Sequence, residues 1–173
     1  MKNALITYCS KTGFTRRYAE WLAEELRLPL LPVEQATAET WRANDSIIHG
    51  GGVYAGVVRG LERVKRGIAD KPGKRLVVFA VGATPATEEY RQTIWKDNFS
   101  SEERRSIPLF YLSGGMDFAR LTLPDKLLIS LFYGLLALKP GKKPNGMPAK
   151  RASYDLSDRA NLQPLIAYLK KMR

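Results

Sequence analysis

Three hydroxyl side chains and a glycine fall close together near the start of the chain, in the stretch YCSKTGFTRR over residues 8–17. An apolar run typical of a strand precedes them, and a helical pattern follows them. Backbone N–H groups at a helix N-terminus lack helical partners, and the helix dipole favours an anion there. Ser10, Thr12 and Thr15 add neutral hydroxyl donors, and Gly13 lets the backbone approach a ligand closely. This stretch therefore predicts a phosphate site that works without a counter-charge.

Other phosphate-binding patterns fit this stretch less well. A Walker loop needs G-x-x-x-x-G-K-[ST] and a Rossmann loop needs G-x-G-x-x-G, and neither follows the first strand. A low-molecular-weight phosphatase would need a nucleophilic cysteine with an arginine six residues later. Cys9 has Thr15 at that distance and Arg16 one residue further, so the spacing does not match.

Strand and helix patterns alternate along the rest of the chain. Apolar runs predict strands at 3–9, 28–33, 45–53, 75–82 and 108–115. Amphipathic patterns predict helices at 15–27, 56–69, from Thr84 to about Lys96, and 161–172. Thr84 and Asn161 are the expected N-caps of the last two helices, with Pro85 and Pro164 in their first turns. Such alternation predicts βαβ units and a parallel sheet covered by helices on both faces.

The pattern S-x-T-G-x-T over residues 10–15 resembles the FMN-phosphate loop of the flavodoxins. Two more loops extend this resemblance: GGGVYAG over 50–56 is similar to the loop that carries an aromatic beside the flavin, and VGATPAT over 81–87 is similar to the loop at its pyrimidine end. The resemblance implies an α/β flavodoxin-like three-layer sandwich, with a five-stranded parallel sheet of order 2-1-3-4-5 and non-covalently bound FMN. The implied cofactor-binding residues are Ser10, Lys11, Thr12, Gly13, Phe14, Thr15, Gly52, Val53, Tyr54, Ala55, Gly56, Gly82, Ala83 and Thr84.

The stretch FYLSGGMDFARLTLPDKLLISLFYGLLAL over residues 110–138 is not typical of short carrier flavodoxins. It resembles the segment after the corresponding strand in quinone-dependent protoporphyrinogen oxidases and their flavodoxin-domain relatives. The resemblance implies an oxidoreductase that acts with a quinone or a porphyrin-like substrate. Two alternatives stay open: a non-enzymatic electron carrier for a partner protein, and a structural or regulatory domain without FMN.

Length and composition limit the possible classes of protein. The 173 residues predict a single domain, 1–173, with an extra apolar helix and loop at about 116–150. The net charge of +11 favours an acidic redox partner or an anionic membrane surface. Nucleic acid is disfavoured, because the aromatics follow core periodicity and no nucleic-acid motif occurs. One cysteine, no signal-peptide pattern and no span of ~18–20 apolar residues lead us to expect a cytoplasmic protein, peripheral at most to the inner face of the membrane.

The apolar helix expected over 124–138 would span about 22 Å, less than the ~30 Å hydrocarbon core of a bilayer. Lysines flank it, so residues 124–143 could contact a membrane surface peripherally, or the helix could pack across the sheet. His49 and Cys9 are expected to be core residues. We expect no catalytic side chain and no metal ligand, because redox chemistry would belong to the flavin.

Overall fold

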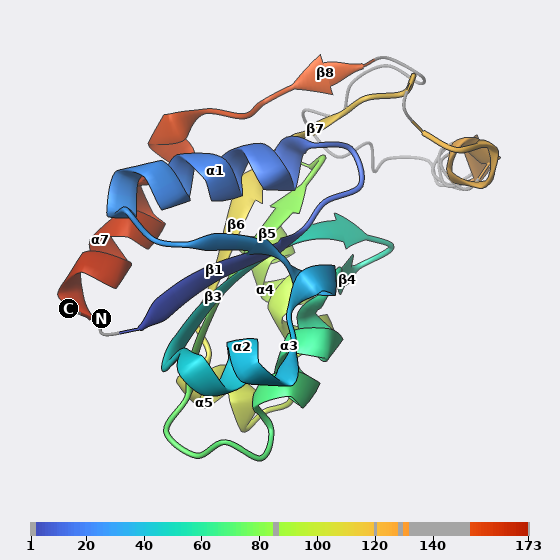
Figure 1. Cartoon of the computed structure of the whole chain (residues 1–173). Helices are drawn as coiled ribbons and strands as arrows, with labels where there is room; N and C mark the ends of the chain where they lie inside the picture. Colours follow the sequence, from blue (N-terminus) through green and yellow to red (C-terminus); the bar gives the residue numbers. More distant parts are fainter. Residues whose placement is uncertain (1–2, 85–86, 120, 128–129, 132–152, 173) are drawn as a thin grey trace.

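A parallel β-sheet forms the centre of the molecule in the computed structural model, which describes residues 3–84, 87–119, 121–127, 130–131 and 153–172 (Figure 1). Its strand order is β2-β1-β3-β5-β6. The bounds are β1 Ala4–Cys9, β2 Leu30–Pro32, β3 Ser46–Tyr54, β5 Arg75–Gly82 and β6 Leu109–Ser113. Counted along the chain, these five parallel strands have the predicted order 2-1-3-4-5, and the predicted α/β class is confirmed. A two-residue strand, β4 (Val57–Val58), adds an antiparallel pair to β3.

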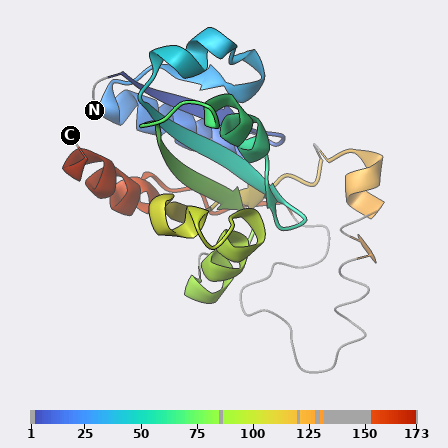
Figure 2. The same cartoon turned by 90° about the horizontal axis from the view of Figure 1, so that it is seen from below.

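Helices cover both faces of this sheet, because its central strands are apolar on both sides. The helices α1 (Phe14–Leu26) and α7 (Gln163–Lys171) lie on one face, and α2, α3, α4 and α5 lie on the other (Figures 1 and 2). The bounds of the second group are α2 Ala38–Ala43, α3 Leu61–Ile68, α4 Glu88–Asn98 and α5 Glu103–Ser106. Two short 3-10 helices, η1 (Val33–Gln35) and η2 (Arg159–Leu162), complete the layers. A separate apolar cluster therefore fills each side of the sheet.

Beyond β6 the chain leaves the sheet and later returns beside it. Two short strands, β7 (Gly115–Met116) and β8 (Tyr154–Asp155), pair antiparallel with Met116 opposite Tyr154. Residues 123–127 and 130–131 between them are helical and lie beyond the carboxyl ends of the strands (Figures 1 and 2). The rest of the predicted 124–138 helix and of the 124–143 contact segment lies outside the described residues. Within the described ranges, no helix has the length and hydropathy of a membrane span.

Two helix starts differ from the sequence prediction. The helix expected over 56–69 begins only at Leu61, because Gly60, with φ 81°, is its N-cap and the residues before it form β4. Thr84 is not the cap of the next helix: the side chain of Thr87 accepts a hydrogen bond from the Tyr90 N–H, so α4 starts at Glu88. Two acidic residues follow Thr87 directly, which suits the positive end of the helix dipole.

Two predictions near the chain's second half also need correction. The predicted strand at 108–115 ends at Ser113, and Gly115 belongs to β7. Asn161 does not cap the last helix but lies within η2, where its amide donates to the Tyr18 hydroxyl at 2.7 Å. Leu162 is the residue before α7, and Pro164 occupies its first turn as predicted.

Candidate functional site

Three loops leave the same edge of the sheet from neighbouring strands. The register pairs Cys9 with Gly51 and Gly52 with Val81, so β1, β3 and β5 end at nearly the same level. The loop after β1 covers residues 10–13 and leads into α1, the end of β3 and its turn cover 52–56, and the end of β5 and the residues after it begin at Gly82. Parallel α/β sheets bind ligands at such carboxyl ends. The topology therefore brings the three predicted site segments to one place.

The first turn of α1 has backbone donors without a side-chain cap. Gly13 is the N-cap with φ 97°, a left-handed conformation that favours glycine, and no side chain accepts from the first turn. No acidic residue lies in that turn, so nothing there repels an anion. The Gly13 N–H donates to Ser10 Oγ at 3.2 Å, which fixes the loop before the helix. An anionic phosphate fits this N-terminus.

The β1 and β3 loops come within contact distance of each other. Thr15 is buried, and a Cβ added to Gly52 would lie 3.2 Å from Thr15 Oγ1, so glycine leaves the space beside the hydroxyl open. The Lys11 ammonium lies 5.1 Å from the centre of the Tyr54 ring, a cation–π distance. These contacts bring four of the predicted site residues together.

A tight hairpin presents Tyr54 at the end of β3. Ala55 and Gly56 connect β3 to β4 with φ 49° and φ 83°, the two positive values of a type I′ turn. The Asn98 side-chain amide of α4 donates to the Gly56 carbonyl at 2.7 Å and so fixes the turn from behind. Val53 pairs with Val58 in the same hairpin. Tyr54 is thus held at the tip of a rigid element.

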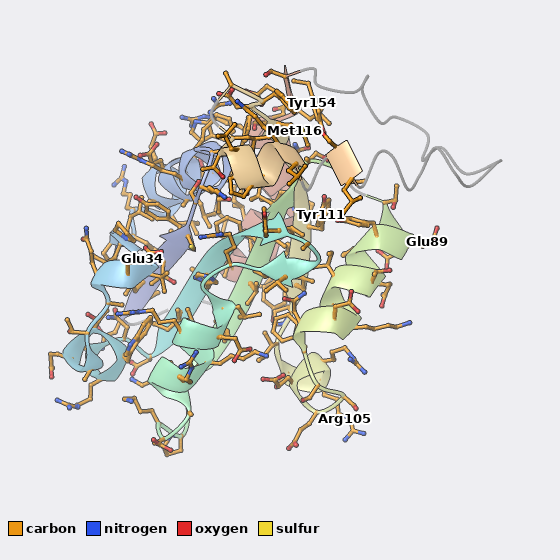
Figure 3. All side chains as sticks on the ribbon, turned by 90° about the vertical axis from the view of Figure 1, so that its right-hand side faces the viewer. Glu34, Glu89, Arg105, Tyr111, Met116 and Tyr154 are labelled. Carbon is orange, nitrogen blue, oxygen red and sulfur yellow. The ribbon has the colours of Figure 1, made fainter. Side chains whose placement is uncertain are left out.

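Two tyrosines outside the predicted set hold the third loop. The Tyr111 hydroxyl donates to the Thr84 carbonyl at 2.8 Å, and the Tyr154 hydroxyl donates to the Ala83 carbonyl at 2.7 Å. Burial raises the pKa of Tyr111, so its hydroxyl stays a donor. Figure 3 shows Tyr154 beside Met116 near the top of the view and Tyr111 below them. A Cβ at Gly82 would overlap the Tyr111 hydroxyl at 2.1 Å, which explains the glycine.

Phe14, another predicted site residue, lies beside Gly115. A Cβ added to Gly115 would lie 2.6 Å from the tip of the Phe14 ring, so this ring lies against β7. A hollow of about 500 Å³ lies on the same side, between the start of α1 and the β7–β8 pair. Its lining includes Thr12 and Gly13 but no residue of 52–56 or 82–84.

The clearest residue that sequence reasoning missed is Asp125. It lies in the helical stretch after β7, yet its carboxylate accepts hydrogen bonds from Lys11 at 2.7 Å and from the Tyr54 hydroxyl at 2.8 Å. Its neighbours in the sequence are apolar or exposed, so no local pattern marks it. A contact made across more than a hundred residues of chain leaves no signal in spacing.

His49 and Cys9 lie in the core beside this edge, as expected. His49 is fully buried; its Nε2–H donates to the Arg59 carbonyl at 2.9 Å, and its Nδ1 accepts from the Thr7 hydroxyl at 3.0 Å. Burial lowers its pKa to about 4, so the ring is neutral at pH 7. Burial likewise raises the pKa of the Cys9 thiol, which donates to Glu34. Neither side chain is set up as an acid or a nucleophile.

This chain is similar to several known proteins. A family model described as a flavodoxin domain matches residues 5–137. Oxidised Flavodoxin 2 from Bacillus cereus is 24% identical over 64% of this chain and 84% of its own, with a TM-score of 0.47. Two-electron reduced Megasphaera elsdenii flavodoxin is 16% identical over 64% and 82%, with a TM-score of 0.45. A flavodoxin from the domain Archaea is 14% identical over 64% and 84%, with a TM-score of 0.42. No curated protein sequence is similar enough to count as a match.

Proposed function

The chain belongs to the flavodoxin-domain family, whose cofactor is FMN, and we propose that it is an FMN-dependent oxidoreductase acting with a quinone or a porphyrin-like substrate. The meeting of the three segments at one sheet edge beside an uncapped helix start carries the FMN site, and the resemblance of residues 110–138 supports the substrate class. FMN supplies the electron chemistry, because it can take up and release one or two electrons. The protein supplies binding, orientation and electrostatics.

Different residues would contact different parts of FMN. The free N–H groups at the start of α1 and the hydroxyls of Ser10, Thr12 and Thr15 would hold the phosphate. Tyr54 would lie against the ring system, where an aromatic contributes about 1 kcal/mol beyond its buried area. The backbone after β5 would face the pyrimidine edge, because the two tyrosine hydroxyls fix its carbonyls at Ala83 and Thr84.

A binding and turnover experiment tests this proposal. The purified chain is titrated with FMN and with riboflavin, and FMN is expected to bind far more tightly because riboflavin has no phosphate. The loaded protein is then mixed with a quinone and a reductant, or with protoporphyrinogen and an acceptor. Multiple turnovers support the oxidoreductase. Reduction by a reductase without turnover of either substrate would support the electron carrier instead, and equal affinity for the two flavins would reject the phosphate site.

The second part of the proposal is that the protein binds peripherally to an anionic membrane surface, through exposed leucines of the helical stretch after β7. Leu123 and Leu127 are 82% and 73% exposed and lie one helical turn apart on the same side of residues 123–127, and Leu131 is 59% exposed. The net charge of +11 would add attraction to anionic lipid. A redox partner protein of acidic character is the alternative occupant.

Co-sedimentation with vesicles separates these partners. Vesicles of mixed neutral and anionic lipid are expected to pellet the wild type at low salt, and Leu127→Glu is expected to stay in the supernatant. Val57→Glu is the matched control, because Val57 is also exposed, at 56%, but lies in the β3–β4 hairpin. Equal sedimentation of all three proteins, or of none, would remove the membrane from the proposal.

A further inference from the structure

One charged side chain of the helical stretch after β7 turns inward while its neighbours face solvent. Asp125 is 2% exposed, whereas Leu123 and Leu127 on the same stretch are 82% and 73% exposed. A buried carboxylate is costly unless it is paired and hydrogen-bonded. The inward position of Asp125 therefore needs partners that compensate its charge.

These partners come from three separate segments. Lys11 Nζ lies 2.5 Å from one carboxylate oxygen and 2.7 Å from the other. The Tyr54 hydroxyl donates to Oδ1 at 2.8 Å, and the Thr122 hydroxyl and N–H donate to Oδ2 at 2.6 Å and 3.1 Å. We call Lys11, Tyr54, Thr122 and Asp125 the Asp125 cluster. One carboxylate thus joins the loop after β1 to the end of β3.

The Asp125 cluster lies apart from the packing of the sheet. Neither apolar cluster of the core includes a residue from 117–127. Two of its members, Lys11 and Tyr54, are also residues of the proposed FMN site. Since truncating one member of a buried ion pair leaves the other charge uncompensated, a change at Asp125 acts first on those two loops. The core should be largely insensitive to it.

We propose that Asp125 is a positioning residue that fastens residues 121–127 across the mouth of the FMN site, where they form its outer wall. This inference rests on the proposed function of the site. The helical stretch lies beyond the carboxyl ends of the strands, the side from which a flavin would enter (Figures 1 and 2). Release of FMN then requires that the contacts of Asp125 to Lys11 and Tyr54 break.

Hydrogen exchange and FMN release test the proposal together. Amide exchange of peptides covering 117–127 is measured with and without FMN, and FMN release is followed by the recovery of its fluorescence. FMN is expected to slow exchange in these peptides of the wild type. Asp125→Asn should abolish this protection and speed FMN release about tenfold, the effect of one lost charged hydrogen bond. Thr122→Val, at an exposed residue that only orients the carboxylate, should give an intermediate effect.

The controls separate this inference from a general loss of structure. Glu25→Gln removes an exposed ion pair with Lys170 at the far end of α1 and should behave as the wild type. Circular dichroism spectra of all variants should match that of the wild type, because the apolar core does not include residues 117–127. If FMN binds the wild type without slowing exchange at 117–127, or if Asp125→Asn releases FMN at the wild-type rate, the inference is wrong. If FMN does not bind the wild type at all, the proposed function itself fails.

Discussion

His49 and Asp125 are a buried imidazole and a buried carboxylate, and the chain accommodates them in opposite ways. His49 lies inside the sheet, where two neutral partners satisfy both ring nitrogens. Asp125 lies outside the sheet and stays charged beside Lys11. The Lys11 ammonium and the Thr122 hydroxyl hold the pKa of Asp125 far below its usual range. The interior of this molecule therefore excludes charge, and the edge proposed to bind FMN retains it.

The difference follows from what surrounds each group. Neighbouring strands shield His49 from water, so the charged form would lose its hydration without gaining an opposite charge. Asp125 has a cation that can reach it from the phosphate loop, because Lys11 is itself only part-buried. A neutral contact fixes the scaffold permanently, whereas an ion pair between two loops can open and close. This contrast predicts which changes affect folding and which affect the cofactor.

The pH dependence of stability should show the largest effect. The pKa of His49 falls from about 6.5 unfolded to about 4 folded, so its contribution is fully present above pH 6.5 and is lost as the pH falls toward 4. The lost free energy of unfolding should reach ~3 kcal/mol. Urea unfolding at a series of pH values measures it, with His49→Gln as the non-titrating control. The contribution of Asp125, with its pKa lowered, should be lost only below about pH 4. If the free energy of unfolding varies with pH in the same way for the wild type and for His49→Gln, His49 does not make this contribution.

Replacing the imidazole should cost stability without changing the cofactor site. His49→Leu leaves the Thr7 hydroxyl and the Arg59 carbonyl without their partner, and the free energy of unfolding should fall by about 2 kcal/mol. FMN affinity of the folded variant should equal that of the wild type. Thermal melts and FMN titration check both statements. The double variant Thr7→Val/His49→Leu should cost less than the sum of its single changes, because the two side chains share a bond.

A change at the start of α1 should weaken FMN binding and leave stability almost unchanged. Thr15→Val should raise the FMN dissociation constant about tenfold, because the phosphate would lose a hydroxyl donor in a buried position. Its melting temperature without FMN should stay close to that of the wild type. Riboflavin affinity is the internal control and should not change, and Thr15→Ser should restore FMN binding. An equal loss for both flavins would mean that the hydroxyl does not face the phosphate.

The smallest effect should come from the second partner of Asp125. Tyr54→Phe keeps the ring but removes the hydroxyl that donates to Asp125, so FMN release should become about two- to threefold faster. In an Asp125→Asn background the same change should have a smaller effect, because the neutral amide oxygen accepts a weaker hydrogen bond. Stopped-flow release rates of the four proteins measure this coupling. Additive effects would show that the two side chains act separately.

Local patterns explain why much of the architecture was predictable. The strand at 75–82 is a continuous apolar run bounded by charged residues and a glycine, and the structure places it at those residues. The start of α1 follows from Gly13 and the hydroxyls around it. By contrast, β4 is two residues long and carries valines that also suit a helix, so only the turn at Ala55 and Gly56 reveals it.

Long-range contacts explain what the sequence could not show. Tyr154 reaches Ala83 and Asp125 reaches Tyr54, each across 71 residues of chain. No periodicity connects such positions, because their meeting depends on how the segment after β6 returns. Thr84 is the N-cap expected from its residue type and from the proline after it. The structure selects Thr87, since the Thr84 carbonyl is already bound by Tyr111.

The β7–β8 pair has a consequence for how this chain can vary in length. Met116 lies opposite Tyr154, so the chain leaves β7 and enters β8 at adjacent points. Whatever lies between them closes a loop, and the entropy of closure grows only slowly with loop length. Replacing 117–153 by a two-residue turn should therefore leave the sheet folded. The residues proposed to border the FMN site and to contact a partner thus lie in a part of the chain whose length could change without rebuilding the sheet.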